Sequence, residues 1–307
     1  MYDFLYKLYF CLKRVQKNKT EKGKEQSYII KRTLDYIERY YNEYFKNSII
    51  KHPSDKYGLN TDSREQKIIV SLTSFPKRIG DVWLTIETLL RQSVKPDKII
   101  LWLADSQFDG LDSLPPQLLN LQKRGLEIRF CDDLRSHKKY YYAMQEYSEN
   151  IVILVDDDMF YPRDTISKLM KMHTKYPQDV CTMTAQFIDG DIDVGPSLWR
   201  NPKLNEKLEH SSRLQIFTGS GSLYPPHSLD ENVFNKALIA NLCPYADDLW
   251  LTYMALKNST KVTMETPWRA FPVTVYGTGD GSLWHINAAQ GKNDEQWQAI
   301  LKYFGEI

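Results

Sequence analysis

The chain of 307 residues has almost no excess charge, few cysteines and no long apolar run. Its 40 lysine and arginine residues nearly balance 39 aspartate and glutamate residues, so the net charge indicates neither a nucleic acid nor an acidic partner. Its 4 cysteines form no C-x-x-C pair, which argues against disulfides or a zinc site and favours a reducing, cytoplasmic compartment. No stretch approaches the roughly 18 apolar residues of a membrane-spanning helix, and the N-terminus lacks a signal-peptide cleavage site. We therefore expect neither a membrane-spanning nor a secreted protein.

Residues 1–66 differ in pattern from the rest of the chain. Residues 1–24 place apolar side chains at helical spacing and carry seven basic side chains against two acidic ones. Such a basic amphipathic helix can lie on an anionic membrane surface, or it can pack on the domain or on a second subunit of a homo-oligomer, and the sequence leaves these readings open. Residues 27–45 repeat the helical pattern, and a polar segment with proline and glycine then predicts a linker. We assign residues 1–66 to a helical extension and linker.

From residue 67 onward, strand patterns alternate with helix patterns. The expected strands cover residues 67–74, 97–105, 126–132 and 150–158, and the expected helices cover residues 78–93, 115–125, 138–148 and 163–177. Four such units predict an α/β domain over residues 67–307, with a mainly parallel, Rossmann-like sheet covered by helices on both faces. Ligands of open sheets of this kind bind at the carboxyl ends of the strands. We therefore look for functional residues where the expected strands end.

Three consecutive carboxylates, Asp156 to Asp158, end the fourth expected strand. Because side chains alternate along a strand, we expect Asp156 and Asp158 to converge on one point and Asp157 to face away. Two carboxylates on one side repel each other unless a cation lies between them. Mg²⁺ and Mn²⁺ suit this position, because they combine a few carboxylates with water and phosphate oxygens. The alternative is a solvated loop, but the apolar strand "IVILV" ahead of the triplet favours a metal site.

Seven stretches of the chain, in this order and spacing, resemble the GT-A-fold glycosyltransferases. They are "VSLTSFPKRI", "LTIETLLRQSVKPDKIILWLAD", "LQKRGLEIRFCDDLRSHKKYYYAM", "DDDMFYP", "GSGSLYPPHSL", "CPYADDLWLTYMAL" and "KNDEQW". Within this group, the chain most resembles family-2-like bacterial enzymes of surface polysaccharide assembly. The resemblance covers residues 67–304 and does not include residues 1–66. It implies a GT-A fold and a metal-dependent hexosyltransferase. The donor would be a nucleotide diphosphate sugar, with UDP favoured, and the acceptor a capsular or lipopolysaccharide glycan.

The resemblance also implies roles on the donor side of the site. "DDD" is similar to the family's D-x-D motif, so Asp156 and Asp158 would hold Mn²⁺ or Mg²⁺ against the diphosphate, with Asp157 nearer the ribose. The other implied donor-binding residues are Thr73, Phe75, Arg78, Asp105, Lys138 and Lys139. For Phe75 the alternative is a core aromatic, and for Asp105 it is a helix cap. The lysines could also be solvated.

A second acidic pair, Asp247 and Asp248, stands at the start of an expected helix. The stretch resembles the family's x-E-D motif, which implies that Asp248 deprotonates the acceptor hydroxyl in an inverting reaction. Asp247 stands where the family usually has glutamate, so the choice of base between the two stays open. Both carboxylates could instead serve the helix N-terminus.

Two glycine-containing stretches complete the predicted site. Gly219 and Gly221 permit close approach of the backbone to a ligand, and the resemblance assigns them to the donor-sugar and acceptor loop. Trp284 and His285 follow a glycine-rich segment near the C-terminus. The resemblance suggests His285 as a third metal ligand on a segment that closes over the donor and excludes water. A structural histidine is the alternative.

Two other functions remain compatible with this fold. A sugar nucleotidyltransferase needs a glycine-rich phosphate loop after the first strand, where this chain has "SLTSFPKRIG". A membrane-associated scaffold or glycan-binding subunit would keep the fold without activity. We favour a cytoplasmic glycosyltransferase, peripheral at the inner face of the plasma membrane, that acts on a lipid-linked glycan.

Overall fold

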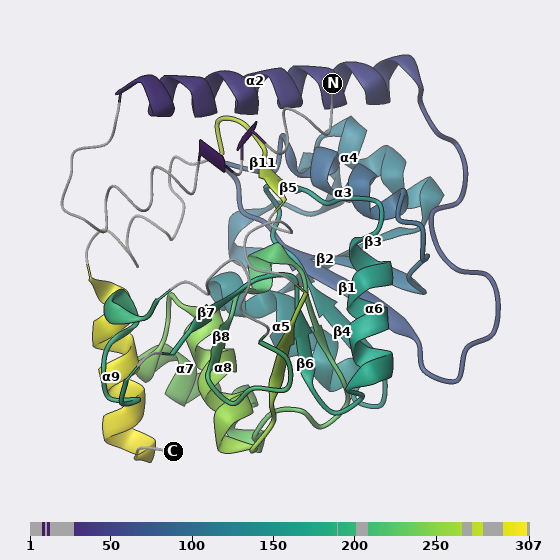
Figure 1. Cartoon of the computed structure of the whole chain (residues 1–307). Helices are drawn as coiled ribbons and strands as arrows, with labels where there is room; N and C mark the ends of the chain where they lie inside the picture. Colours follow the sequence, from purple (N-terminus) through teal and green to yellow (C-terminus); the bar gives the residue numbers. More distant parts are fainter. Residues whose placement is uncertain are drawn as a thin grey trace.

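The computed structural model describes residues 8–9, 11–12, 28–188, 190–200, 208–265, 272–278 and 291–305. These residues form a seven-stranded central sheet flanked by helices, with a long N-terminal helix lying across one end (Figure 1). The strand order is β10-β6-β9-β4-β1-β2-β3. The predicted α/β class and the mainly parallel sheet are therefore confirmed.

The strands of the central sheet are β1 (Ile68–Thr73), β2 (Lys98–Ala104), β3 (Leu126–Cys131), β4 (Ile151–Leu154), β6 (Val180–Thr182), β9 (Ser222–Tyr224) and β10 (Val262–Met264). β1 pairs in parallel with β2 and β4, and β2 pairs in parallel with β3. β9 runs antiparallel between β4 and β6 and directly follows Gly221, for which the sequence predicts a loop and no strand. Two small ribbons join β5 (Met159–Phe160) to β11 (Val273–Thr274) and β7 (Ala185–Phe187) to β8 (Leu214–Ile216).

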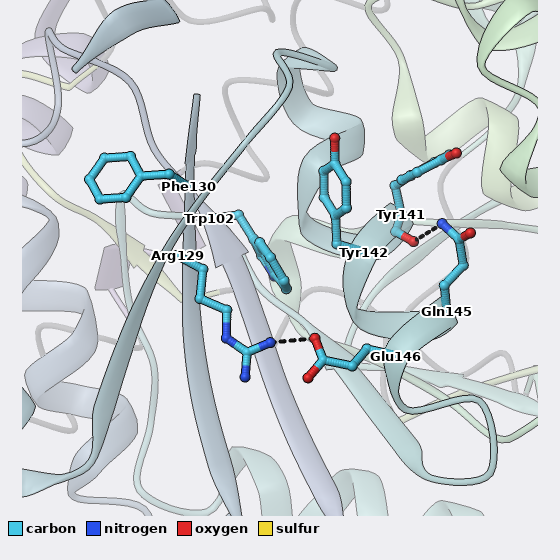
Figure 2. A pocket seen from close by; sticks show the side chains of 7 residues that line it. All are labelled: Trp102, Arg129, Phe130, Tyr141, Tyr142, Gln145 and Glu146. Carbon is cyan, nitrogen blue, oxygen red and sulfur yellow. Dashed lines mark hydrogen bonds and ion pairs between the residues drawn. The ribbon is translucent and has the colours of Figure 1, made fainter. Parts of the chain in front are cut away.

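An open depression of about 740 Å³ lies beside β3, at the end of the strand order (Figure 2). It is lined by Trp102, Arg129, Phe130, Tyr141, Tyr142, Gln145 and Glu146. Arg129 pairs with Glu146 across it, and the ring of Trp102 is almost wholly buried beneath Tyr142. None of its lining residues belongs to the predicted site.

Helices cover both faces of the central sheet. One face packs against α3 (Val82–Leu90), α4 (Pro116–Asn120) and α6 (Thr165–Lys175). The other packs against α5 (Lys138–Glu146), α7 (Lys236–Leu242), α8 (Asp247–Lys257) and α9 (Lys292–Phe304). Short 3-10 turns lie at Asp105–Gln107, Leu111–Ser113, Leu121–Arg124, Arg135–His137, Pro196–Leu198, Thr218–Ser220 and Glu231–Phe234.

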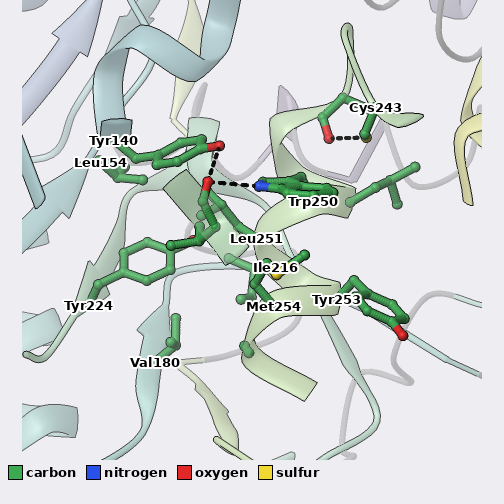
Figure 3. Close-up of a cluster of buried hydrophobic side chains, with 14 of the residues drawn as sticks. Tyr140, Leu154, Val180, Ile216, Tyr224, Cys243, Trp250, Leu251, Tyr253 and Met254 are labelled. Atoms are coloured by element: carbon green, nitrogen blue, oxygen red, sulfur yellow. Dashed lines mark hydrogen bonds between the residues drawn. The ribbon is translucent and has the colours of Figure 1, made fainter. Parts of the chain in front are cut away.

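The core on the α5 and α8 side fixes the start of α8. Trp250 is fully buried, and its indole Nε1 donates to the Val233 carbonyl oxygen at 3.1 Å. The Tyr140 hydroxyl of α5 donates to the same oxygen at 3.3 Å (Figure 3). Burying an aromatic side chain of this size contributes about 2–3 kcal/mol. Two helices that carry predicted site residues, α5 and α8, are thus held against each other.

The N-terminal helix α2 (Tyr28–Lys51) packs over the β5 and β11 ribbon (Figure 1). Its buried stripe faces Leu84, Phe160, Val273 and Val275. Of residues 1–24, the structure describes four, and Leu8, Tyr9 and Leu12 pack on the same cluster. These residues therefore contact the domain, and the membrane and subunit readings of residues 1–24 stay predictions. No helix in the described part of the chain has the length and apolarity needed to cross a bilayer.

Candidate active site

The three aspartates lie in the connection between β4 and β5, at the carboxyl end of the central strands. β4 ends at Leu154, four residues earlier than expected, and the chain turns at residues 157–158 into the β5 ribbon. The expected alternation of side chains is therefore wrong here, because alternation requires extended backbone. Asp157 does not face away from Asp158, since both carboxylates contact Arg78.

Arg78 and Ser74 hold the second and third aspartates. Arg78 Nη1 donates to Asp157 Oδ1 at 2.7 Å, and Nη2 lies 3.0 Å from Asp158 Oδ2. Ser74 Oγ donates to Asp157 Oδ2 at 2.5 Å, so both oxygens of Asp157 are occupied. Burial raises the pKa of Asp158 to about 7, and the charge of Asp157 adds to this while Arg78 opposes it. Arg78, predicted as a phosphate contact, is bound by carboxylates instead.

Lys139 joins the first aspartate to the second acidic motif. Its Nζ lies 2.6 Å from Asp156 Oδ1, 2.8 Å from Thr218 Oγ1 and 2.9 Å from Asp247 Oδ2. The Lys139 side chain is only 3% exposed. Burial lowers its pKa, but Asp156, Asp247 and Asp248 outweigh burial and raise the pKa above its ordinary value. Lys139 is therefore a buried, permanently charged ammonium.

Asp247 and Asp248 begin α8 and differ in protonation. Burial raises the pKa of Asp247, but Lys139, His137 and Ser136 together outweigh burial and lower this pKa to about 2. Burial raises the pKa of Asp248 to about 7, with the charge of Asp247 adding to it. Asp248 Oδ1 accepts from Thr218 N at 2.9 Å and from Thr218 Oγ1 at 2.5 Å, whereas its Oδ2 has no hydrogen bond among the described residues. A partly exposed carboxylate with this pKa suits a general base.

The alternative of helix capping for this pair finds no support in the contacts. The N-cap residue of α8 is Ala246, without a side-chain capping bond. The carboxylates of Asp247 and Asp248 accept instead from Lys139 and Thr218. Their charges still lie favourably at the helix N-terminus.

The charge of the acid pocket, defined as Asp156 to Asp158 with Asp247 and Asp248, fits a divalent cation. Its five carboxylates face two cations, Arg78 and Lys139. Asp156 Oδ2 and Asp158 Oδ1 have no hydrogen bond among the described residues, and all donors are oxygens, which Mg²⁺ and Mn²⁺ prefer. In the described part of the chain no group of three His, Cys, Asp or Glu residues is arranged to hold a metal. A divalent cation bound to these two carboxylates would need water or phosphate oxygens for its remaining ligand positions.

The missing side chain at Gly219 leaves room for the Asp156 carboxylate. A Cβ on Gly219 would lie 2.2 Å from Asp156 Oδ2, closer than any real contact. Tyr161 fixes the same contact, because its hydroxyl accepts from Asp156 N at 2.8 Å and donates to the Gly219 carbonyl oxygen at 2.7 Å. Gly221 serves the turn itself, since its φ is +101°.

The remaining predicted donor residues lie at the ends of β1 and β2 or apart from the pocket. Thr73 Oγ1 donates to the Trp102 carbonyl oxygen at 2.8 Å, and the Phe75 ring carries the Arg78 guanidinium 5.4 Å from its centre. Asp105 is exposed and begins a 3-10 turn without capping a backbone N–H. Lys138 pairs with Asp133 at 2.6 Å and not with the acid pocket. Trp284 and His285 lie outside the described residues.

Several contact residues were not singled out from the sequence. Ser74 belongs to the quoted stretch "VSLTSFPKRI" and Thr218 directly precedes "GSGSLYPPHSL", but the sequence does not indicate which partner a hydroxyl group will have. Thr278 accepts from Arg78 Nε through its carbonyl oxygen at 3.1 Å, and its hydroxyl lies 3.4 Å from Asp158 Oδ2. It is 120 residues from Asp158, so only the fold brings them together.

The chain matches no family model and no curated protein. Among solved structures it is similar to the mannosyltransferase PcManGT from Pyrobaculum calidifontis in complex with GDP-Man and Mn²⁺, at 14% identity and a TM-score of 0.48, over 99% of this chain and 76% of that one. It is also similar to S. aureus TarS 1–349, at 15% identity and 0.41, over 66% and 58%. A third is 4-diphosphocytidyl-2C-methyl-D-erythritol synthase, at 9% identity and 0.41, over 69% and 94%. At these distances the function must be argued from the chain's own side chains.

Proposed function

We propose that the protein is a metal-dependent glycosyltransferase that moves a sugar from a nucleotide diphosphate donor to a glycan hydroxyl. The observation that carries the proposal is the meeting of two acidic motifs on one buried lysine. Lys139 contacts Asp156 from the turn after β4 and Asp247 from the start of α8. One motif offers oxygens for a cation and the other a carboxylate with a pKa near neutrality. Sugar transfer from a diphosphate needs both.

Asp156 and Asp158 would hold Mn²⁺ or Mg²⁺ through the oxygens that have no hydrogen bond among the described residues. When bound, the ion neutralises the negative charge that develops on the leaving diphosphate. Arg78 and Ser74 neutralise and fix Asp157, which keeps the turn in place. His285 remains our proposed third ligand.

Asp248 acts as the base in this proposal. Its Oδ2 takes the proton of the acceptor hydroxyl while that oxygen forms a bond to the anomeric carbon and the bond to the diphosphate breaks, which inverts the configuration. The Thr218 N–H and hydroxyl orient Asp248 through its other oxygen. Asp247 is tied to Lys139 and has a pKa of about 2, so it is too weak a base for this step.

The donor we propose is UDP-linked, with Thr73, Phe75 and Asp105 at the strand ends near the nucleotide base. The acceptor we propose is a lipid-linked bacterial surface glycan, and the enzyme would work in the cytoplasm at the inner face of the plasma membrane. The glycosyltransferase domain would span residues 67–307. These finer assignments rest on the resemblance of the quoted motifs.

The test is release of nucleotide diphosphate by the full chain with Mn²⁺ and a panel of nucleotide sugars and glycan acceptors. Asp248→Asn is expected to lower turnover by about 100-fold or more, the usual contribution of a general base, and Asp158→Asn to weaken the response to Mn²⁺. Asp164→Asn is the matched control, because Asp164 is exposed and, among the described residues, pairs only with Lys168 on α6. An Asp158→Asn variant with full activity at low Mn²⁺ contradicts the metal assignment. No turnover with any donor favours the scaffold reading.

A further inference from the structure

The outer face of α2 carries an unusual concentration of exposed apolar side chains. Ten large apolar side chains are exposed in the described part of the chain, and six of them lie on α2 or shortly after it: Tyr28, Ile29, Tyr36, Tyr44, Ile50 and Tyr57. Ile29 is 75% exposed and Tyr36 is 67% exposed. Single exposed apolar residues are ordinary, whereas a group of them on one element marks an interaction surface.

The exposed surface of α2 as a whole is positively charged. Five basic side chains of α2 are exposed, against the two acidic side chains Asp35 and Glu43. The basic residues are Lys31, Arg32, Arg39, Lys46 and Lys51. Arg39 lies 3.4 Å from Asp35, which leaves the other four cations with little local compensation. Tyrosine, isoleucine and basic residues together are typical of helices at a lipid interface.

The opposite face of α2 packs against the rest of the domain. Leu34, Ile37, Tyr41 and Ile49 are buried against the domain. Leu8, Tyr9 and Leu12 add to the same inner cluster, so they do not cover the outer face. An amphipathic helix normally directs its polar face to water. Here the outward face has apolar groups in addition to the packed stripe, and folding of the domain does not require them.

We propose that the outer face of α2 binds the surface of an anionic lipid bilayer. The tyrosines and isoleucines would lie at the headgroup boundary, and the lysine and arginine side chains would reach the anionic headgroups. A second copy of this chain suits the face less well, because two such faces would bring like charges together. The proposal differs from membrane binding by residues 1–24 and does not depend on any catalytic activity.

This orientation would hold the acid pocket close to the lipid surface. Phe45 of α2 stacks on Phe160 with ring centres 4.6 Å apart, and Phe160 follows Asp158 by two residues. Asn42 Nδ2 also donates to the Thr274 carbonyl oxygen of β11 at 3.4 Å. The β5 and β11 ribbon therefore packs against α2 and also contacts the turn that carries Asp158, since Val275 N donates to the Asp158 carbonyl oxygen.

The test is cosedimentation of the full chain with vesicles of equal parts phosphatidylcholine and phosphatidylglycerol, and with vesicles of phosphatidylcholine alone. The wild type is expected to bind the mixed vesicles, more weakly as salt is added. A variant with Arg32→Gln, Lys46→Gln and Lys51→Gln is expected to bind about 100-fold more weakly, at about fivefold per cation. A variant with Ile29→Ser and Tyr36→Ser is expected to lose about tenfold.

The matched control replaces three exposed lysines elsewhere, Lys123→Gln, Lys171→Gln and Lys302→Gln, and keeps the same net charge as the first variant. It should bind within about twofold of the wild type, allowing for long-range charge. Equal loss in the control and the α2 variant would overturn the proposal, as would unchanged binding of both α2 variants. If the wild type does not bind vesicles but forms a dimer, and the Ile29→Ser, Tyr36→Ser variant is a monomer, the outer face of α2 would instead bind a second copy of the chain.

Discussion

Replacing Lys139 by methionine should destabilise the protein far more than the same change at Lys138. Both side chains are 3% exposed, and each pairs with a carboxylate at 2.6 Å. Lys139 also contacts Asp247, whereas the Asp133 partner of Lys138 is 30% exposed and can turn to water. Methionine has a similar length and no charge, so the two variants differ mainly in the carboxylates that they leave unpaired.

The expected magnitude follows from the buried charges. The pKa of Asp247 is about 2, against an ordinary 3.8, which corresponds to roughly 2 kcal/mol of stabilisation at neutral pH. This stabilisation is present above pH 3.8 and is lost as the pH falls through about 2, because the folded-state pKa is lowered. Breaking a buried ion pair such as Lys139–Asp247 typically costs about 3–5 kcal/mol, whereas the Asp156 carboxylate is 37% exposed and can turn to water as Asp133 can. For Lys138→Met we expect about 1 kcal/mol.

The measurement is urea unfolding of both variants followed by tryptophan fluorescence at pH 7 and pH 5. The free energy of unfolding of Lys139→Met should be about 3–5 kcal/mol below that of the wild type at pH 7. The deficit should shrink at pH 5, since the unpaired carboxylates can then take up protons. Equal losses in the two variants, or a deficit that grows at pH 5, would refute the reasoning.

Two further predictions concern catalysis and metal binding. The kcat/KM of the wild type should rise with pH around 7, because Asp248 must lose its proton to act as a base. Thr218→Val should move the midpoint of this pH profile upward, since the Thr218 hydrogen bond lowers the pKa of Asp248. An unchanged midpoint would show that a group other than Asp248 titrates. Gly219→Ala should weaken Mn²⁺ binding in calorimetry by about tenfold or more, because its Cβ displaces Asp156. Gly80→Ala, with open space around its Cβ, is the control, and equal affinities in the two variants would exclude Asp156 as a ligand.

The sheet was predictable because its strands carry strong local patterns. The first three strands begin and end within one residue of the expected ranges, since β-branched residues run up to polar ends. The fourth expected strand was too long, because the apolar pattern continues to Val155 and gives no sign of the turn at residues 157–158. β9 is three residues long, too short for a pattern to be read, and it finds its place only through pairing with β4 and β6.

The sequence pointed to the acidic residues of the candidate site, but it did not show which side chains pair with each other. The rule that ligands bind at the carboxyl ends of strands pointed to Asp156 and Asp158. It could not distinguish Lys138 from Lys139, since both are neighbours on one helix. Successive helical residues point about 100° apart, so only one of them can face the pocket. The structure gives this position to Lys139.

The sequence by itself determined the α/β class, the first four strands of the central sheet and the presence of two acidic motifs, because these depend on neighbouring residues. The tertiary structure decided how the charges are paired. Lys139 meets Asp247 across more than a hundred residues, and Asp158 meets Thr278 across 120. Which carboxylate keeps its proton near pH 7 depends on burial and on these partners. The division of roles between Asp247 and Asp248 is therefore a property of the folded chain.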